Sequence, residues 1–138
     1  MKINAYIEFN GNCEEAIKFY EKAFGEKAEI MRFGDMPPNE GYTPPPDTAN
    51  LIMNARLPFG DSSIYLCDLP PTDKVQIGYN VNISAEFDDF DKAKSVFTAL
   101  SEGGKIFMPF EPTFWTKGFG SLRDKFDIPW QITLPTNG

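Results

Sequence analysis

The sequence contains no histidine and only two cysteines, Cys13 and Cys67, among its 138 residues. The absence of histidine removes imidazole as a metal ligand. Two cysteines far apart in a chain with no signal-peptide pattern at its start are typical of buried free thiols in a reducing compartment, and not of a disulfide framework. We therefore expect a cytoplasmic protein.

Long apolar runs are also absent, since no stretch approaches the roughly 20 residues that cross a bilayer. Basic residues are few: 13 Lys and Arg stand against 20 Asp and Glu, a net charge of −7, and they are scattered along the chain. Nucleic acids and anionic membranes both need a local density of cations, so neither is expected as a partner. The charge favours a neutral or cationic small-molecule ligand.

Apolar and aromatic side chains are abundant. Hydrophobic residues make up 41% of the chain and aromatic residues 14%, including 13 Phe. This composition predicts a packed core and argues against disorder. The length suits one domain or two small fused modules, because single domains commonly have ~100–150 residues.

The first quarter of the chain predicts a strand and then a helix. Apolar and polar side chains alternate over residues 3–10, which is the period of a half-buried strand. Asn12 is placed to cap a helix with Glu15 at its third position, as in a capping box, and Gly25 is placed to end it. The apolar stripe of this helix comprises Ala16, Ile17, Tyr20, Ala23 and Phe24.

Two strands and a loop are expected next. Residues 26–35 can form a strand, whereas residues 36–47 contain five prolines and predict an exposed loop or flap. Residues 51–57 and 62–67 then read as strands around a hairpin turn at 58–61. Residues 70–75 are expected to be a linker.

The same plan recurs in the second half. Residues 78–85 alternate as a strand, Asp88 or Asp89 can cap a helix, Gly103 and Gly104 end it, and a strand follows over 105–108. The predicted stripe of the helix comprises Phe90, Ala93, Val96, Phe97 and Leu100.

Residues 114–134 predict a closing hairpin, with glycines where backbone must pass closely. Its tight connection is 124–127. Asp127 tolerates the left-handed conformation and can close an Asx turn there.

Both halves therefore read strand, helix, three strands. We expect an α+β protein with tandem βαβββ modules, at about 1–69 and 76–138, in one domain spanning 1–138. Because four strands cannot bury both faces alone, the modules should pair into a cupped, mostly antiparallel sheet with the helices on its convex side. A ligand would lie on the concave side.

Several motifs carry a resemblance to a known family: EFNGNCEEAIKFY at 8–20, LIMNARL at 51–57, LSEGG at 100–104, FWTKGFG at 114–120, DKF at 124–126 and Trp130. In this order they resemble the PhnB-like branch of the vicinal oxygen chelate superfamily. That superfamily includes glyoxalase I, extradiol dioxygenases and bleomycin-binding resistance proteins. The resemblance implies the glyoxalase/bleomycin resistance fold and a homodimer.

The resemblance also implies a divalent metal held by one residue from each of four strands. Those positions fall on Asn4 or Ala5, Tyr65, Asn80 and Gln131. Amide oxygens and a phenol are poor ligands for a first-row transition metal, so we expect no metal and no other cofactor. Some relatives are described as resembling a demethylubiquinone methyltransferase, but the chain lacks the glycine-rich strand-to-helix turn that cradles a nucleotide-like cofactor.

The expected pocket combines hydrogen-bonding groups with an aromatic wall, although an ordinary solvated sheet face has the same alternation. Glu8 and Arg56 fit either a general base with an anion clamp or an ion pair across the sheet. The candidate pocket residues, in addition to Asn4, are Tyr6, Glu8, Asn54, Arg56, Tyr65, Asn80, Asn82, Trp115 and Gln131.

Three functional hypotheses follow. The first is a metal-free protein that binds a small molecule in the concave pocket. The second is a lyase, isomerase or dioxygenase with a non-standard metal site or with Glu8, Tyr65 or Glu111 as acid or base. The third is a scaffold for dimerisation or protein contact, which a filled cavity and an exposed apolar patch would favour.

Overall fold

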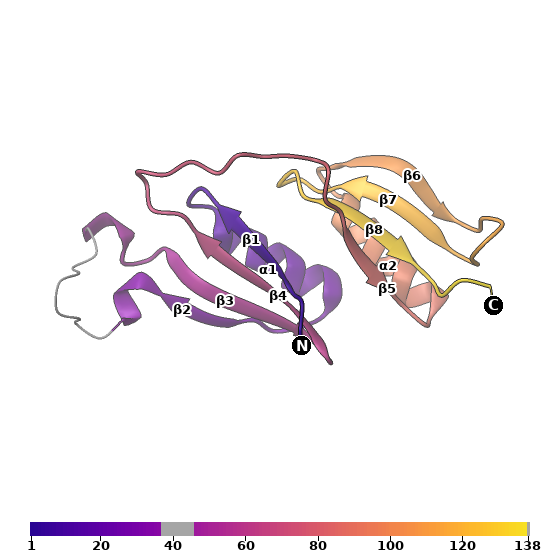
Figure 1. Ribbon diagram of the computed structural model, residues 1–138, viewed down its shortest axis with the longest axis horizontal. Coiled ribbons are helices and arrows are strands. Elements are labelled where there is room, and N and C mark those ends of the chain that lie inside the picture. The colour runs from indigo at the N-terminus through magenta and orange to yellow at the C-terminus, as the bar shows by residue number, and fades with distance from the viewer. Residues whose placement is uncertain (37–45, 138) are drawn as a thin grey trace. The chain divides into compact units, whose positions relative to one another are not determined.

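The computed structural model describes residues 1–36 and 46–137, in a chain that divides into two compact units, 1–76 and 77–138 (Figure 1). Each unit has one helix and four strands in the order strand, helix, three strands. This order confirms the tandem βαβββ plan and the α+β class. Most of the expected proline-rich flap, 37–45, lies outside the described residues, and the cupped joint sheet stays a prediction.

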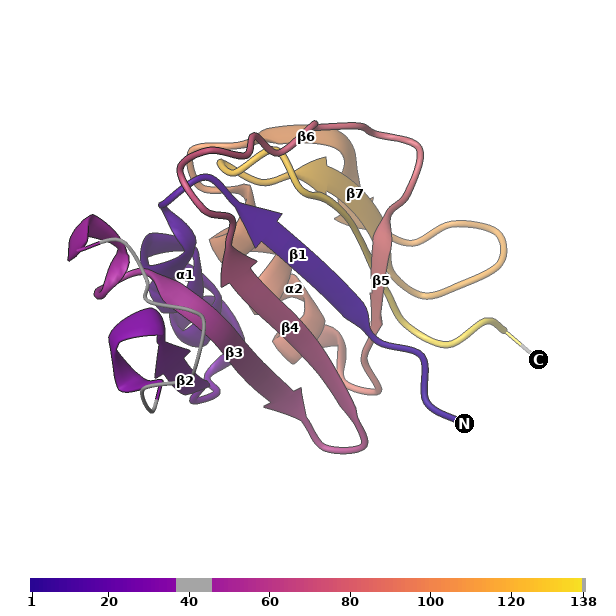
Figure 2. The same cartoon turned by 60° about the vertical axis from the view of Figure 1, so that its left-hand side comes forward.

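The first unit is a mixed four-stranded sheet with one helix. Its elements are β1 (Ala5–Phe9), α1 (Cys13–Phe24), β2 (Glu29–Arg32), β3 (Ile52–Phe59) and β4 (Ser62–Asp68). The strand order is β1-β4-β3-β2, with β1 parallel to β4 and the other neighbours antiparallel (Figure 2). The helix packs against β3 and β4.

The second unit repeats this topology. Its elements are β5 (Ile83–Glu86), α2 (Phe90–Ser101), β6 (Lys105–Glu111), β7 (Phe119–Arg123) and β8 (Pro129–Thr133). The strand order is β5-β8-β7-β6, again with one parallel pair, β5 with β8. The helix packs against β6, β7 and β8. Both sheets are therefore mostly antiparallel, as expected.

The buried stripe of α1 is as predicted, but the residue that caps its N-terminus is not. The whole predicted stripe is buried, and Gly25 ends the helix with φ 71°. Asn12 occupies the N-cap position without a side-chain hydrogen bond, because its backbone lacks the extended conformation that aims a capping side chain at the first turn. Instead, buried Asp68 accepts hydrogen bonds from the backbone N–H of Cys13 and of Ile52, each at 3.0 Å.

Two expected strands are shorter than the sequence pattern. The residues expected to form a strand over 26–35 do so only at Glu29–Arg32, after which Phe33–Asp35 form a 3₁₀ turn closed by Asp35, which accepts from the Arg32 N–H at 3.0 Å. The strand expected over 78–85 begins only at Ile83, which pairs with Trp130. Pro129 precedes Trp130 and has no N–H to extend the ladder.

The first large apolar side chain of each alternating pattern is consequently exposed. Ile3 is 89% exposed and Val81 is 70% exposed. Both precede the paired residues, since the ladder of β1 begins with Ala5 opposite Ile64. An apolar side chain that fits the alternating pattern of a strand stays exposed to solvent when no neighbouring strand pairs with its backbone.

The helix α2 is capped as predicted. Asp89 accepts a hydrogen bond from the Lys92 N–H at 2.8 Å. The stripe residues from Ala93 onward are buried, but Phe90 is 37% exposed. As the first residue of the helix it lies at the rim of the core, where its ring packs against Phe110 with centroids 5.2 Å apart.

The hairpin of β7 and β8 is organised by Asp124. This buried carboxylate accepts hydrogen bonds from the N–H groups of Phe126 at 2.8 Å and Ile128 at 3.1 Å, and from Nε1 of Trp130 at 2.8 Å. Asp127 adopts the left-handed conformation as predicted, with φ 67°. Asp124, and not Asp127, supplies the carboxylate that closes the turn.

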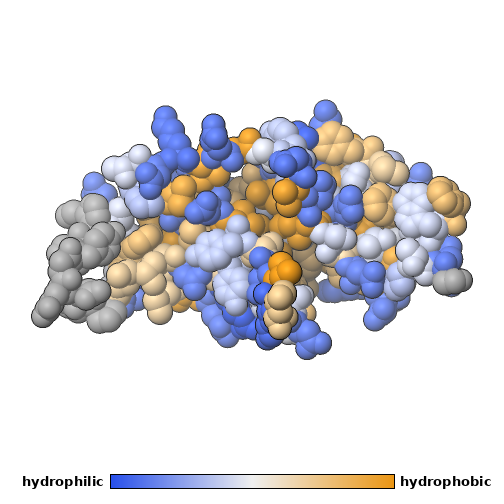
Figure 3. All heavy atoms as spheres, in the orientation of Figure 1, coloured by the Kyte–Doolittle hydropathy of each residue, from blue (hydrophilic) through white to orange (hydrophobic). Residues whose placement is uncertain are grey.

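The surface mixes polar and apolar residues (Figure 3). On the edge strand β6, Ile106, Phe107 and Met108 are 46%, 47% and 44% exposed. Within the described residues, neither helix has the length and apolarity of a membrane span.

Candidate functional site

The polar face of the first sheet carries a row of four side chains across its strands. Tyr6 stands opposite Tyr65, Tyr65 opposite Arg56, and Arg56 opposite Glu29. The rings of Tyr6 and Tyr65 are stacked, with centroids 6.0 Å apart and planes within 11°. Three of the predicted pocket residues therefore lie in one row, with Arg56 next to Tyr65.

Arg56 pairs with Glu29 and not with Glu8 as the sequence suggested. Its Nη1 lies 3.4 Å from Oε2 of Glu29. The strand register explains the difference, because Glu29 stands opposite Arg56 on β2 whereas Glu8 stands opposite Cys67 on β4. The side chains of this pair are 36% and 73% exposed, so the attraction between them is weak.

The hydroxyl of Tyr6 connects this row to the next. It donates a hydrogen bond to Oδ1 of Asn54 at 3.4 Å. Burial of the hydroxyl, together with a hydrogen bond to Cys67, raises the pKa of Tyr6 to about 12. Burial also raises the pKa of the Cys67 thiol, so the thiol stays protonated at neutral pH and is a poor nucleophile. On this face, Tyr6, Asn54, Arg56 and Glu29 therefore have protein partners.

The polar face of the second sheet instead lines a cavity of about 300 Å³. Ser121 and Gln131 face it from directly paired positions on β7 and β8. Asn82 and Arg123 add two further polar side chains, and the apolar lining is made by Tyr79, Phe107, Met108, Phe119, Leu122 and Pro129. Asn82 and Gln131 were predicted from the sequence; Ser121 and Arg123 were not.

Arg123 brings a positive charge to this cavity. Its Cζ lies 3.5 Å from the ring centroid of Tyr79 and 4.9 Å from that of Phe107. Its Nε is buried and has no hydrogen-bond partner among the described residues. The signal in the sequence was the alternation over β7, which places Phe119, Ser121 and Arg123 on the face opposite buried Gly120 and Leu122.

The remaining predicted residues lie outside this lining. Asn80 is exposed and precedes β5, and Asn4 is exposed and precedes β1, so neither belongs to a strand. Trp115 is half-buried and packs edge-on against Phe119, with ring centroids 5.5 Å apart. Trp115 therefore contacts one aromatic residue of the lining without lining the cavity itself. Glu111 is exposed at the end of β6.

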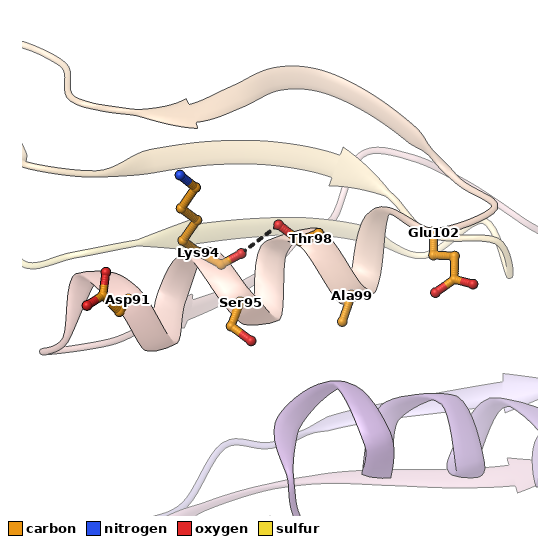
Figure 4. Close-up of a pocket in the computed structure, with 6 residues that line it drawn as sticks. All are labelled: Asp91, Lys94, Ser95, Thr98, Ala99 and Glu102. Carbon is orange, nitrogen blue, oxygen red and sulfur yellow. Dashed lines mark hydrogen bonds between the residues drawn. The ribbon is translucent and has the colours of Figure 1, made fainter.

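A second hollow, of about 450 Å³, runs along one side of α2 (Figure 4). Its lining residues all belong to this helix or its C-cap: Asp91, Lys94, Ser95, Thr98, Ala99 and Glu102. Thr98 Oγ1 donates to the Lys94 carbonyl within the helix at 2.9 Å. Groups from a single helix do not converge on a ligand, so we do not consider this hollow a candidate site.

Comparison with known proteins now identifies the family. A family model described as 3-demethylubiquinone-9 3-methyltransferase matches residues 1–133. The chain belongs to this PhnB-like family. Its sequence is 32% identical to Protein YjdN of Escherichia coli, over 97% of this chain and 95% of that protein.

Solved structures agree with this membership. The chain is similar to protein PA1353 from Pseudomonas aeruginosa, with 34% identity, a TM-score of 0.84 and 98% of each chain covered. A glyoxylase/bleomycin resistance protein/dioxygenase domain from Frankia shares 13% identity and a TM-score of 0.68, over 100% of this chain and 93% of that one. The latter likeness shows the fold alone, which is the glyoxalase/bleomycin resistance fold that the motifs implied.

The metal site expected of the vicinal oxygen chelate superfamily does not fit this PhnB-like chain. Asn4 and Asn80 precede their strands, and Ala5, the alternative to Asn4, has no side chain that could bind a metal ion. Within residues 1–36 and 46–137, no three His, Cys, Asp or Glu side chains form a group that could hold a metal ion. Amides and a phenol provide little charge compensation for a divalent cation.

Proposed function

We propose that this PhnB-like protein binds a small molecule, without a metal ion, in the cavity of the second unit. The observation that supports it is the convergence of four polar side chains and three aromatic rings on one cavity of about 300 Å³. A few convergent polar groups in an apolar, concave lining are typical of small-molecule sites, which commonly measure ~300–1,000 Å³.

The polar groups of the cavity are available for a ligand. Asn82, Ser121 and Gln131 make no side-chain hydrogen bond to other described residues, in contrast to Tyr6 and Asn54 on the first sheet. The two amides each offer a donor and an acceptor, and the hydroxyl offers both. A ligand with mixed polarity therefore finds both hydrogen-bonding partners and ring surfaces in this lining.

The lining changes the expected charge of the ligand. The net charge of −7 suggested a neutral or cationic molecule. The described residues around this cavity include Arg123 and no carboxylate, so the local charge is opposite to that of the whole chain. We do not carry the preference for a cation into the proposal.

Catalysis is not part of the proposal. Glu8 and Glu111 are exposed, and neither lines the cavity. Methyl transfer, which the family description names, lacks support as well, since the turn between β1 and α1 contains one glycine and the turn between β5 and α2 contains none. A glycine-rich turn at such a position is what brings backbone N–H groups to a nucleotide-like cofactor.

The test is a titration of ¹⁵N-labelled protein with a set of small aromatic and polar compounds. We expect at least one compound to shift the resonances of Ser121 and Gln131, and Gln131→Ala to weaken its binding about tenfold. Gln76→Ala, at an exposed position, is the matched control. If no compound in a broad set shifts these resonances, the proposed function is wrong.

The exposed apolar run Ile106–Met108 of β6 supports a second proposal, that two copies of the chain associate. Three neighbouring large apolar side chains on an edge strand, each more than 40% exposed, favour association. Light scattering after gel filtration should give twice the chain mass, and Ile106→Lys should lower it. Ile77→Lys, also at an exposed isoleucine, should leave it unchanged. A wild-type mass of one chain would exclude the dimer.

A further inference from the structure

We infer that Arg123 makes the cavity of the second unit selective for an aromatic carboxylate. This inference rests on the proposed function and names the class of its ligand. A carboxylate would face the guanidinium, and its ring would lie among the aromatic side chains of the lining.

The first support is the charge around Arg123. It takes part in no ion pair with a described residue. Its cross-strand neighbour on β6 is Lys105, a second cation. Like charges directly opposite each other in a sheet repel, so this arrangement is unfavourable without an anion nearby. The nearest acidic side chain along the chain, Asp124, is buried and already accepts three hydrogen bonds.

The second support is the unused hydrogen-bonding capacity of the guanidinium. Its Nε is buried without an acceptor among the described residues. A buried donor left unpaired costs roughly 1–3 kcal/mol. Guanidinium groups bind planar carboxylates through two parallel N–H donors, which is the strongest pairing available to them. A ligand carboxylate would supply the missing acceptor.

The third support is the shape of the surroundings. Tyr79 and Phe107 contact the guanidinium, and Phe119 lies in the same lining. Tyr79 lies outside helix and strand and is 47% exposed, so its ring can turn without disturbing the sheet. Ring faces that hold a planar cation also stack on a planar ligand.

A purely structural role for Arg123 is the competing explanation. The cation–π contact with Tyr79 would then only attach residues 77–82 to the sheet. The two explanations differ in one measurable quantity, the ratio of affinities for an acid and its neutral amide.

The experiment uses 2-naphthoate and 2-naphthamide, which differ in charge but hardly in shape, with the full chain and isothermal titration calorimetry. We expect the carboxylate to bind at least about tenfold more tightly than the amide. Raising the ionic strength from about 0.1 M to about 1 M should weaken the carboxylate alone.

Three variants identify the residue responsible. Arg123→Gln should reduce the acid-to-amide ratio to about one while leaving amide binding within about threefold. Arg123→Lys keeps the charge without the planar fork and should retain part of the preference. Lys105→Gln removes an equal charge from the opposite residue, outside the lining, and should keep the full ratio.

The outcomes separate the two proposals. Equal affinity for acid and amide, with shifts at Ser121 and Gln131, would overturn the inference and leave the proposed function intact. A preference for the acid that survives in Arg123→Gln, or disappears in Lys105→Gln, would overturn the assignment to Arg123. Binding of neither probe would overturn the inference, and the proposed function would then depend on the wider compound set. Thermal unfolding of each variant shows whether it is folded. If Arg123→Gln is not folded, Arg123→Lys still tests the assignment.

Discussion

The two units share one order of elements but differ in how their polar sheet faces are completed. In the first unit Tyr6 bonds to Asn54, Arg56 pairs with Glu29, and two tyrosine rings stack. In the second unit Arg123 and Gln131 line a cavity without protein partners for hydrogen bonding among the described residues. The duplicated fold therefore does not require a duplicated site, because the polar face is free to diverge while the helix-covered face is not.

The units also place a buried carboxylate differently. Asp68 joins the start of α1 to the start of β3, whereas Asp124 closes the turn between β7 and β8 and holds the Trp130 indole. Asp68 binds the N-terminus of α1, a role that the sequence pattern assigned to Asn12. Asp124 closes the hairpin turn, a role that the pattern assigned to Asp127. The largest expected effects test these two carboxylates.

Asp124→Ala should reduce the free energy of unfolding of the second unit by about 4 kcal/mol, since it leaves three donors without an acceptor. Asp68→Ala should cost the first unit about 3 kcal/mol, since it leaves two. Denaturant unfolding gives the loss, and hydrogen exchange with mass spectrometry shows which unit opens.

Asp61→Ala is the control for both substitutions, because Asp61 is exposed in the β3–β4 turn. Its effect should stay within about 0.5 kcal/mol. If Asp124→Ala behaves like this control, the hydrogen bonds to Asp124 do not stabilise the hairpin.

Close packing also distinguishes the units, and Gly120→Ala should cost about 3 kcal/mol. A Cβ at Gly120 would lie 2.6 Å from the Phe97 ring and 2.9 Å from the Phe110 Cα. In the first unit, Gly60 lies in the β3–β4 turn and faces open space with φ 64°. Gly60→Ala should therefore cost only the strain of a left-handed alanine, about 1 kcal/mol. Thermal unfolding of the two variants checks the order, and equal losses would contradict it.

The hydroxyl of Tyr6 should titrate late. Its pKa is raised to about 12 in the folded protein, above the usual value of ~10. The protonated hydroxyl is thus favoured by folding, so its contribution is complete below about pH 10 and is lost as the pH rises towards 12. Tyr6 is 54% exposed, so water screens part of this contribution.

The difference in absorbance at the phenolate band between wild type and Tyr6→Phe isolates this hydroxyl. We expect the difference to develop near pH 12. A difference that is complete near pH 10 would show that burial and the hydrogen bond to Cys67 do not raise the pKa of this hydroxyl.

The smallest effect is expected for the exposed ion pair of the first sheet. Glu29→Gln should change the free energy of unfolding by at most about 0.5 kcal/mol, because both partners are solvated. The comparison with Asp68→Ala in the same unit shows that burial, and not charge, decides the cost. A loss as large as that of Asp68→Ala would contradict this reasoning.

Most of the fold could be predicted because it depends on local periodicity. The stripe of α1, the glycine after it, the Asp89 cap of α2 and the left-handed Asp127 all follow from neighbouring residues. The errors fall where the partner is distant in the chain. Asn12 was expected to cap α1, but Asp68 accepts the Cys13 N–H from a strand 55 positions away.

The candidate site was less predictable for the same reason. Alternation predicted Asn82 and the family resemblance predicted Gln131, and both line the cavity. Asn80 does not line it and lies further than Asn82 from the start of the β5 ladder at Ile83. Arg123 was overlooked because an arginine near the end of a strand has no local feature that distinguishes it from a solvated side chain. Its contact with Tyr79, on a segment outside β5, exists only in the folded chain.

The family, the two βαβββ repeats and the apolar face of each strand follow from the order and period of the side chains along the chain. Which polar groups pair with one another depends on strand register, and so on the folded chain. Strand register sets Glu29 against Arg56 in one unit and Lys105 against Arg123 in the other. These neighbours come from different segments of the chain, so no single segment predicts them. They give Arg56 an acidic partner in the first sheet and leave Arg123 in the second sheet for a candidate ligand.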